Sequence, residues 1–267
     1  MTISRNGTSW FTRLAHRVGD TWTVVTFGIP MLSHSTSLRV GRETLQLHQW
    51  SGSQVGSGGF LWGASRRLAR YIEAHGDGCP ERGSAPAVAS RPLPGLKLLE
   101  LGSGTGGMGL AAAILGAHVT LTDQASHIYP GEAQPTAPTA ERTLLDLAKV
   151  NVQQNAAVLP LPLPTVAKLW WGDLADLAAL PHPTYDIVVG SDVLLFTRSH
   201  QGLLLTLQQL SSSSTVVLLE HTDRGNLSDE FPRDLQHFLD LVIEEGLWAP
   251  TIVYDCGRHI TLRMVYA

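Results

Sequence analysis

Residues 98–109, LLELGSGTGGMG, have the types and spacing of a segment that could bind a nucleoside cofactor. An apolar run with β character leads into glycines, and glycine lets a backbone approach a ligand where a Cβ would collide. The small-residue helix that follows offers unpaired N–H groups and a partial positive charge at its N-terminus. A second apolar run ends at Asp123, whose carboxylate can accept hydrogen bonds from the hydroxyls of a ribose. This order of strand, glycine turn, helix, strand and acid is typical of a nucleoside-cofactor site.

The glycine pattern is compatible with two classes of cofactor. GSGTGG at residues 102–107 contains G-x-G-x-x-G, which is typical of dinucleotide binding, and also the closer spacing G-x-G-x-G. Glu100 lies two residues before the first glycine, where it would repel a pyrophosphate but attract a sulfonium or an ammonium group. A tight turn without any ligand is the alternative, and the acid at Asp123 argues against it. We therefore predict S-adenosylmethionine as the cofactor, contacted by Glu100, Asp123, Gly102, Gly104 and Gly106.

Composition and charge argue against several other classes of protein. The chain has 267 residues, a formal net charge of −4 and a pI near 6.2, which leaves no basic footprint for nucleic acid. Cys79 and Cys256 form neither a disulfide framework nor a metal-ligand spacing, and the histidines are scattered. No apolar stretch is long enough to span a membrane. We expect no metal, no nucleic acid and no membrane association, and a monomer in a reducing compartment.

The first twenty residues allow two interpretations. Three arginines precede the first acid, Asp20, and apolar residues fall at helical spacing, namely Trp10, Phe11, Leu14 and Val18. An amphipathic helix that packs on the domain has this pattern, and so does an organellar presequence. We expect a cytoplasmic protein, with a mitochondrial location as the alternative.

The chain divides into three segments by pattern. Residues 1–36 form an extension, 37–95 a pre-core unit and 96–267 a cofactor-binding core. Alternation predicts a β-hairpin over Gly41, then a helix after Trp62 and a loop over 75–95. In the core, the patterns predict strands over 98–101, 119–123, 166–171, 186–192 and 215–221, and helices over 110–115, 140–154, 201–210 and 231–245. A final hairpin joins strands over 249–254 and 259–266.

Alternating strands and helices that end in an antiparallel hairpin predict an α/β fold. The expected sheet is doubly wound, seven-stranded and mostly parallel, the Rossmann-like plan of class I methyltransferases, preceded by an N-terminal hairpin and helix. Ligands on such sheets lie at the carboxyl ends of the strands. We therefore expect the glycine turn, Asp123, Trp171, Asp192 and Glu220 to meet in one cleft. Alternation along the strand turns Trp170 to the face opposite Trp171.

Several motifs together resemble those of a known family. They are Gln49 with the helix entry at 59–72, the glycine motif at 98–106, the strand at 119–123, the pair Asn151 and Asn155, and residues 169–172. Over residues 45–266 the chain resembles the seven-β-strand protein methyltransferases, in their methyltransferase-like lysine branch. The resemblance implies an enzyme that uses S-adenosylmethionine and has a protein as its substrate.

The resemblance also implies roles for the cofactor residues. Glu100 would hold the methionine ammonium, Asp123 would bind the ribose hydroxyls, and Trp171 would flank the adenine with its aromatic face. Trp62 would close the cofactor pocket from the N-terminal side, with simple core packing as its alternative. Ser191, which directly precedes Asp192, is also counted with the predicted cofactor contacts.

The acceptor side departs from the family pattern at one position. Asp192 carries over as the predicted catalytic residue, which would orient the nitrogen that receives the methyl group. The lysine enzymes have an aromatic residue, usually tyrosine, three positions later, where this chain has Leu195, and Phe196 comes one residue late. Lysine stays the favoured acceptor, with arginine and histidine open. Glu220 and His221 are further substrate-side candidates.

Two other functions stay open from the sequence. A methyltransferase for a small molecule would bury its acceptor under a lid, and the loops at 75–95 and 126–139 could serve as lids. A fold that has lost catalysis and acts as an interaction protein is the other alternative. The complete set of cofactor residues argues against it, because a scaffold has no physical need for Glu100 or Asp123.

Overall fold

A seven-stranded sheet forms the centre of the molecule. The computed structural model describes residues 13–18, 21–26, 32–51, 56–76, 93–125, 143–222, 234–255 and 259–266. The sheet order is β10-β11-β9-β8-β5-β6-β7, with strands β5 (Lys97–Leu101), β6 (His118–Asp123), β7 (Thr165–Lys168), β8 (Ile187–Ser191), β9 (Val216–Thr222), β10 (Trp248–Asp255) and β11 (His259–Tyr266). Strands β5 to β9 run parallel, whereas β11 pairs antiparallel with both β9 and β10. The predicted fold is therefore confirmed.

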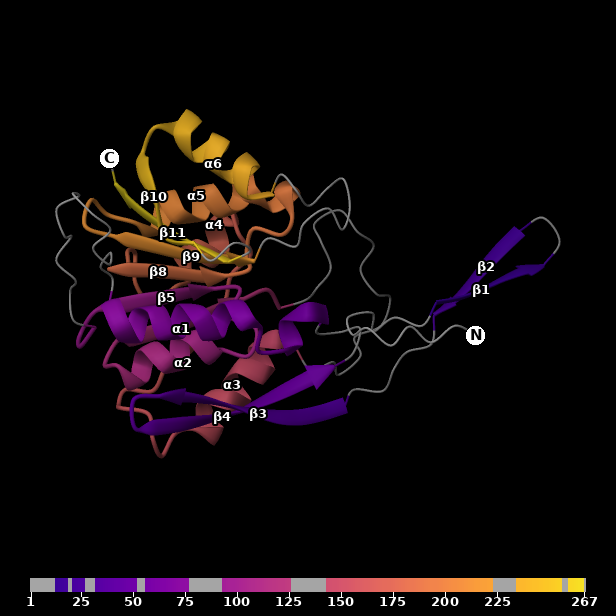
Figure 1. The fold of residues 1–267 in the computed structure, drawn as a ribbon, viewed down its shortest axis with the longest axis horizontal. Coiled ribbons are helices and arrows are strands. Elements are labelled where there is room, and N and C mark those ends of the chain that lie inside the picture. Colours follow the sequence, from indigo (N-terminus) through magenta and orange to yellow (C-terminus); the bar gives the residue numbers. More distant parts are fainter. Residues whose placement is uncertain are drawn as a thin grey trace.

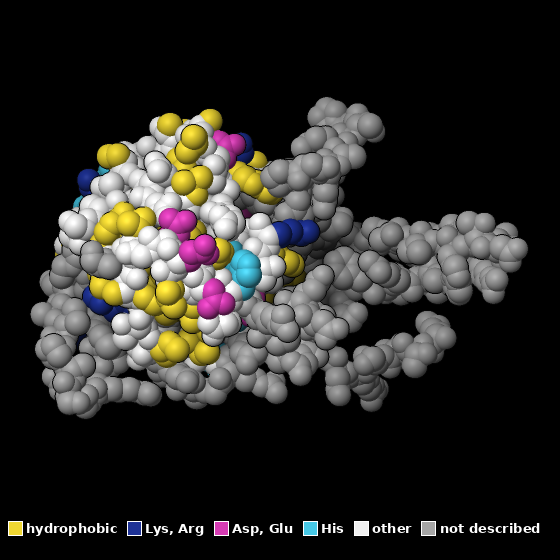
Figure 2. Space-filling model, turned by 90° about the horizontal axis from the view of Figure 1, so that it is seen from above, with side chains coloured by type: hydrophobic (Ala, Val, Ile, Leu, Met, Phe, Trp, Pro, Cys, Tyr) yellow, Lys and Arg dark blue, Asp and Glu magenta, His cyan; other side chains and the backbone are white. Residues whose placement is uncertain are grey.

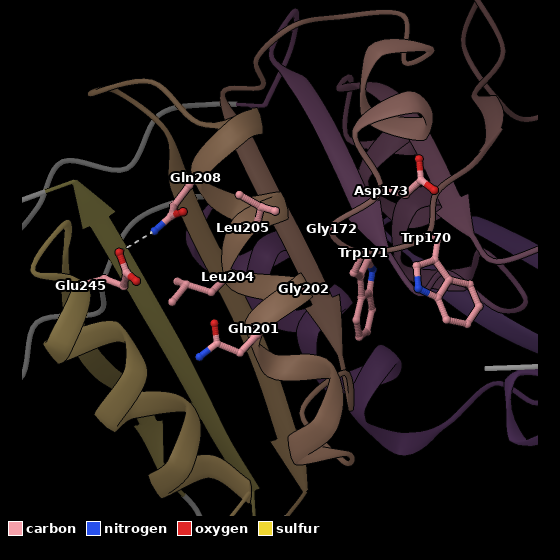
Figure 3. A pocket seen from close by; sticks show the side chains of 10 residues that line it. All are labelled: Trp170, Trp171, Gly172, Asp173, Gln201, Gly202, Leu204, Leu205, Gln208 and Glu245. Carbon is pink, nitrogen blue, oxygen red and sulfur yellow. Dashed lines mark hydrogen bonds between the residues drawn. The ribbon is translucent and has the colours of Figure 1, made fainter. Parts of the chain in front are cut away.

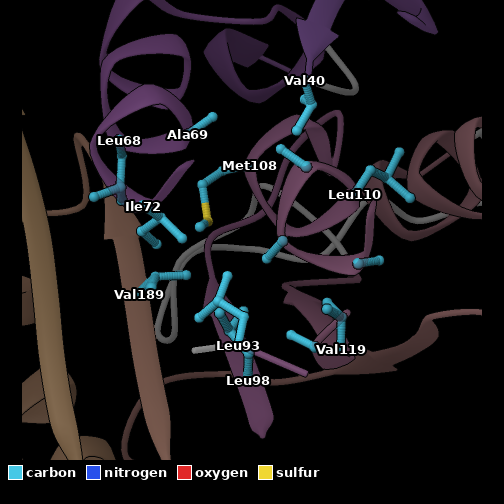
Figure 4. Close-up of a cluster of buried hydrophobic side chains, with 14 of the residues drawn as sticks. Val40, Leu68, Ala69, Ile72, Leu93, Leu98, Met108, Leu110, Val119 and Val189 are labelled. Carbon is cyan, nitrogen blue, oxygen red and sulfur yellow. The ribbon is translucent and has the colours of Figure 1, made fainter. Parts of the chain in front are cut away.

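Helices cover both faces of this sheet (Figure 1). Helices α1 (Gly63–His75), α2 (Gly107–Ile114) and α3 (Leu144–Gln154) lie on one face, and α4 (Leu174–Ala178), α5 (His200–Leu210) and α6 (Asp234–Glu245) on the other. Because successive strand residues point to opposite faces, Leu98 and Val189 join the core under α1 and α2, which Figure 4 shows. Leu99 and Val188 join the core under α5 and α6.

The order of the parallel strands reverses between β5 and β8. From β5 the chain winds outward through β6 and β7 to one edge, and β8 then pairs on the other side of β5. In open α/β sheets, ligands bind at such a switch point, outside the carboxyl ends of the strands. The glycine turn follows β5 and Asp192 follows β8, so the switch point lies between the two segments that the sequence singled out.

An N-terminal hairpin packs beside α2 and α3. Strands β3 (Leu32–Val40) and β4 (Glu43–Ser51) are joined at Gly41, whose φ is 55°. Helix α3 holds the edge of β4 through two side-chain amides: Asn155 Oδ1 accepts from Gln46 N at 2.8 Å, and Asn151 Oδ1 accepts from His48 N at 2.7 Å. Residues four apart on a helix and two apart on a strand have similar spacing. Asn151 and Asn155, four residues apart on α3, can therefore bond to His48 and Gln46, two residues apart on β4.

The expectation of an N-terminal helix is wrong for residues 13–18. They form strand β1 (Arg13–Val18), which pairs antiparallel with β2 (Thr21–Thr26). The second of these strands, TWTVVT, is rich in β-branched residues, and a partner of that composition favours strand pairing over the helical spacing in the first. Trp10 and Phe11 lie outside the described residues, as do most of the predicted loops at 75–95 and 126–139.

The third parallel strand ends earlier than the sequence pattern predicts. Strand β7 stops at Lys168, and Asp173 caps the short helix α4, accepting from Ala175 N and Asp176 N. The predicted strand over 166–171 is therefore wrong in its end, and strand alternation does not apply to Trp170 and Trp171, which both line a surface groove. Helix α3 begins at a capping box between Thr143 and Asp146, four residues after the predicted start.

Candidate functional site

The glycine turn lies against three other segments of the chain. Gly102 and Gly104 have φ values of 59° and 51°, a region that residues with a Cβ seldom adopt. A Cβ on Gly102 would lie 3.3 Å from Val193 Cγ1 and 3.5 Å from Trp171 Cζ2. A Cβ on Gly104 would collide with the carbonyl oxygen of Gly58 in the 3₁₀ helix η1 (Gly56–Gly59). The turn is thus surrounded by η1, the end of β7 and the end of β8.

Asp123 braces this turn from the end of β6. Its Oδ2 accepts from Gly104 N at 2.7 Å, its Oδ1 accepts from Gln124 N at 2.8 Å, and the side chain is buried. Burial raises the pKa of Asp123 to about 6, while the two backbone hydrogen bonds oppose that shift. The sequence placed Asp123 correctly at the carboxyl edge beside the glycines. Its contact with a ribose stays a prediction.

Glu100 lies below the turn, inside the protein. Its Oε2 accepts from Gly109 N in the first turns of α2 at 2.8 Å, and the residue is 1% exposed. Burial raises the pKa of Glu100 to about 8, and the nearby Asp123 adds to the shift. In this arrangement the carboxyl is mostly protonated at neutral pH, whereas a cation close to it would favour the charged form. Its contact with a methionine ammonium therefore stays a prediction.

Trp62 stands at the edge of the site. Its indole Nε1 donates to Ser57 O at 2.7 Å, and the residue is 40% exposed. The neighbouring Leu61 N donates to Gln49 Oε1 at 2.8 Å, which ties the start of α1 to β4. Trp62 is therefore tied to η1, the element that lies against the glycine turn, and no sequence pattern predicts this role for Ser57 or Gly58.

Asn151 connects the glycine turn with the hairpin. Its Nδ2 donates to Thr105 O at 2.9 Å and to His48 O at 3.1 Å, and the side chain is completely buried. Asn155 makes the corresponding bonds to β4 but none to the turn in the described bonding pattern. The first asparagine of the pair thus also fixes the cofactor segment.

Asp192 follows Ser191 at the end of β8 in an unusual backbone conformation. Its φ is 57°, the only positive value among the described residues other than glycine. Such a conformation costs about 1–3 kcal/mol and persists where the surroundings determine it. Asp192 N donates to Glu220 O at 2.8 Å, and Asp192 Oδ1 accepts from Thr222 N at 2.8 Å. The carboxylate therefore lies beside the end of β9.

Glu220 and His221 point to opposite faces of β9. Glu220 is fully buried on the α1 side, where Arg67 Nε donates to its Oε1 at 2.6 Å and Thr261 Oγ1 donates to its Oε2 at 2.6 Å. Burial raises the pKa of Glu220, against the effect of these hydrogen bonds. His221 lies on the α6 side, 3.4 Å from Asp234 Oδ1. Only Glu220 thus shares the surroundings of Asp192.

A buried histidine holds the segment after Asp192. His200 Nε2 lies 2.9 Å from Leu194 O, and His200 Nδ1 lies 2.9 Å from His237 Nδ1. Burial lowers the pKa of His200, so the neutral ring prevails at neutral pH. Because a carbonyl can only accept, neutral His200 donates from Nε2 and must accept at Nδ1 from His237. The loop that carries Leu195 is thereby anchored to α5 and α6.

Trp171 separates the glycine turn from a surface groove on α5. The groove has a volume of about 590 Å³ and is lined by Trp170, Trp171, Gly172, Asp173, Gln201, Gly202, Leu204, Leu205, Gln208 and Glu245 (Figure 3). Figure 2 shows the molecule from above the view of Figure 1, with hydrophobic side chains beside carboxylates on that face. Leu174 and Ile243 are exposed on α4 and α6.

In the described part of the chain, no helix is long and apolar enough to cross a membrane.

Comparison with known proteins decides the family. A family model described as lysine methyltransferase matches residues 41–130 and 137–238. The chain belongs to the lysine methyltransferase family. Protein N-lysine methyltransferase METTL21A of Danio rerio is 34% identical over 183 residues, covering 68% of this methyltransferase and 69% of that protein. EEF1A lysine methyltransferase 3 of Xenopus tropicalis is 29% identical over 221 residues, covering 80% and 81%.

A solved structure supports the fold of this methyltransferase. The 16S rRNA N2 G1207 methyltransferase RsmC of T. thermophilus superposes with a TM-score of 0.58 at 16% identity. The match covers 96% of this chain and 58% of that chain. At this identity the likeness shows a shared fold and nothing about the acceptor. The recognition of a class I, S-adenosylmethionine-dependent methyltransferase from the sequence is confirmed.

The residues around the turn fit S-adenosylmethionine. Trp171 stands beside Gly102, since its Cζ2 would lie 3.5 Å from a Cβ at that position, and an aromatic side chain next to the turn can flank adenine. Ser103 Oγ is buried without a hydrogen-bond partner among the described residues, so a polar ligand can satisfy it. The described residues contain no group of three or more His, Cys, Asp or Glu side chains that could hold a metal ion.

The loop after β8 contains the position at which this methyltransferase departs from the family pattern, with leucine in place of an aromatic residue. Leu195 is half-buried, and the next residue, Phe196, is 43% exposed. The guanidinium carbon of Arg198 lies 5.3 Å from the centre of the Phe196 ring. An aromatic side chain is therefore present one position late, on the outer side of the loop that His200 anchors.

Proposed function

We propose that this methyltransferase transfers the methyl group of S-adenosylmethionine to the amine of a lysine side chain in a protein. The observation that carries the proposal is the convergence of the glycine turn, Asp123 and Asp192 at the switch point of the sheet. Two relatives named as lysine methyltransferases of proteins support the acceptor. Bound S-adenosylmethionine supplies an electrophilic methyl group on a sulfonium.

The residues of this chain would mainly align the reactants. Methyl transfer is an in-line displacement, so positioning of the nucleophile supplies much of the rate. Asp192 would accept a hydrogen bond from the target amine and orient its lone pair. Trp62 and η1 would cover the cofactor, and Asp123 would hold the ribose beside Gly104.

Methyl transfer with labelled cofactor tests the proposal. The protein is incubated with S-adenosylmethionine carrying a labelled methyl group and with a cell extract, and labelled proteins are identified by mass spectrometry. We expect methyl-lysine in one or a few proteins. Label on arginine, on histidine or in the small-molecule fraction would replace the lysine assignment. Tight binding of S-adenosylhomocysteine with no labelled product would favour an interaction protein.

We also propose a cytoplasmic monomer whose partner is its protein substrate, without stable contacts to nucleic acid or membrane. The net charge of −4 and the scarcity of cysteine support these assignments. Cell fractionation tests the location against a mitochondrial alternative. Light scattering during size exclusion tests the oligomeric state.

A further inference from the structure

A hydrogen-bonded relay runs from α1 to the carboxylate of Asp192. Arg67 Nη2 donates to Thr222 Oγ1 at 2.8 Å, and Thr222 Oγ1 lies 3.4 Å from Asp192 Oδ2. A guanidinium can only donate and a carboxylate can only accept. The Thr222 hydroxyl must therefore accept from Arg67, which leaves its own proton for Asp192. Thr222 N completes the contact by donating to Asp192 Oδ1 at 2.8 Å.

The guanidinium of Arg67 is itself fixed in place. Its Nε donates to Glu220 Oε1 at 2.6 Å, and Thr261 Oγ1 occupies the other oxygen of this fully buried carboxyl. Charge-assisted hydrogen bonds of this kind set the geometry of a planar guanidinium. A Cβ on Gly63 would lie 2.9 Å from Arg67 Nη1, so glycine at the start of α1 leaves room for the group.

The hydrogen bonds of this relay end on a residue, Asp192, whose backbone conformation is unusual. A residue with a side chain stays at a φ of 57° only where its surroundings determine it. Two of the hydrogen bonds that surround the Asp192 carboxylate come from Thr222. Arg67 in turn orients the hydroxyl of Thr222. We propose that Arg67 and Thr222 are positioning residues that hold the Asp192 carboxylate toward the methyl acceptor. This role rests on the proposed function of Asp192.

Thr222→Val is the main test, because valine keeps the shape and removes only the hydroxyl. The ion pair of Arg67 and Glu220 stays intact in this variant. Methyl transfer to extract proteins is measured at rising extract concentration with saturating cofactor. We expect kcat to fall about tenfold, the effect of one well-placed polar contact. The half-saturating extract concentration and the Kd of S-adenosylhomocysteine should stay within about twofold. Thr222→Ser should restore kcat.

A second variant tests the guanidinium. Arg67→Met alone would leave Glu220 as a lone buried charge and could unfold the protein, so it is combined with Glu220→Gln. The matched control is Arg66→Met, because Arg66 also makes two hydrogen bonds from α1, but to Ser37 O and Thr36 Oγ1 on β3. We expect the double variant to lose kcat as Thr222→Val does. Arg66→Met should keep the wild-type kcat even if it is less stable.

A measurement that does not depend on methyl transfer separates the positioning role of Arg67 and Thr222 from the proposed function. The backbone ¹³C and ¹⁵N chemical shifts of Asp192 report its left-handed conformation. We expect them to change in Thr222→Val and in the double variant, and to stay constant in Arg66→Met. Unchanged shifts in Thr222→Val, a wild-type kcat, or a loss of cofactor affinity that parallels kcat would each overturn the proposal. If the wild-type protein labels no protein, the proposed function fails, and the chemical shifts alone decide the positioning.

Discussion

At the scale of single residues, three carboxyl groups at strand ends have different surroundings. Asp123 accepts two backbone hydrogen bonds, Glu100 accepts one in a fully buried position, and Asp192 bonds to Thr222. The sequence predicts that Asp123 and Asp192 lie at the carboxyl edge of the sheet, because each comes at the end of an apolar strand, and it places Glu100 two residues before the glycine turn. It does not predict the partners Gly104, Gly109 and Thr222, since these lie 9 to 30 residues away from the acids that they bond to.

Asp123→Ala should weaken cofactor binding and retain the fold. The variant loses the carboxylate proposed for the ribose, and charge-assisted hydrogen bonds are worth about 1.5–3 kcal/mol each. We expect the Kd of S-adenosylhomocysteine to rise about tenfold or more in titration calorimetry. Asp186→Ala is the control, because Asp186 accepts from Lys97 N at the opposite, amino-terminal edge of the sheet. An unchanged Kd in Asp123→Ala would place the ribose elsewhere.

Asp192→Asn should reduce turnover and leave cofactor binding nearly intact. The amide keeps the size of the side chain but loses the charge that orients the acceptor amine. We expect kcat to fall about 100-fold, the scale of a positioning or proton-accepting group. Rates of methyl transfer and the Kd of S-adenosylhomocysteine are measured together. Equal losses in both would assign Asp192 to the methionine pocket instead of the acceptor site.

Leu195→Tyr tests whether the departure from the family pattern alters acceptor choice. The substitution restores an aromatic residue three positions after Asp192. If leucine limits lysine methylation, the variant should form methyl-lysine faster, measured by mass spectrometry of labelled extract proteins. Phe196→Ala serves for comparison, since Phe196 is the aromatic residue that the chain already has in this loop. A slower reaction in Leu195→Tyr would show that leucine belongs to the working acceptor site.

At the scale of elements, the site depends on how the N-terminal hairpin and α1 meet the sheet. Helix α3 holds β4 through two asparagines, α1 reaches β9 through Arg67, and η1 lies on the glycine turn. Sequence periodicity predicts most of these elements within a few residues. It does not predict α4 or the early end of β7, because neither is long enough to show a period.

The asparagine pair allows a matched test of this arrangement. Asn151→Ala and Asn155→Ala each leave backbone groups of β4 without partners, at a cost of about 1–3 kcal/mol. Both should lower the free energy of unfolding in urea by similar amounts. Only Asn151 also bonds to Thr105 O in the glycine turn, so only Asn151→Ala should weaken S-adenosylhomocysteine binding. Equal affinities in the two variants would contradict a role of Asn151 in the cofactor site.

At the scale of the whole molecule, the buried acids link stability to pH. Glu100 and Asp123 have pKa values of about 8 and about 6, both above their ordinary values. The folded protein therefore keeps protons that the unfolded chain has already released, which stabilises the fold at low pH. This contribution is lost as the pH rises from about 4 to about 8.

Without cofactor, the free energy of unfolding should fall across this range of pH. The slope of each titrating group is at most about 1.4 kcal/mol per pH unit. Glu100→Gln should flatten the decline between pH 6 and pH 8, which urea unfolding at several pH values would measure. Glu43→Gln, on an exposed residue of β4, is the control. A decline of the same slope in Glu100→Gln would show that other groups cause it.

The sequence by itself determined the local features of this protein. The apolar strands, the glycine turn, Asp123 and the final hairpin can be read from neighbouring residues, because strand period and glycine freedom are local properties. They were enough to predict the fold, the cofactor and the family. The tertiary structure decided which side chains meet. Arg67 meets Glu220 across 153 positions, and Gly58 meets Gly104. Such contacts depend on how separate elements pack, which no local pattern records.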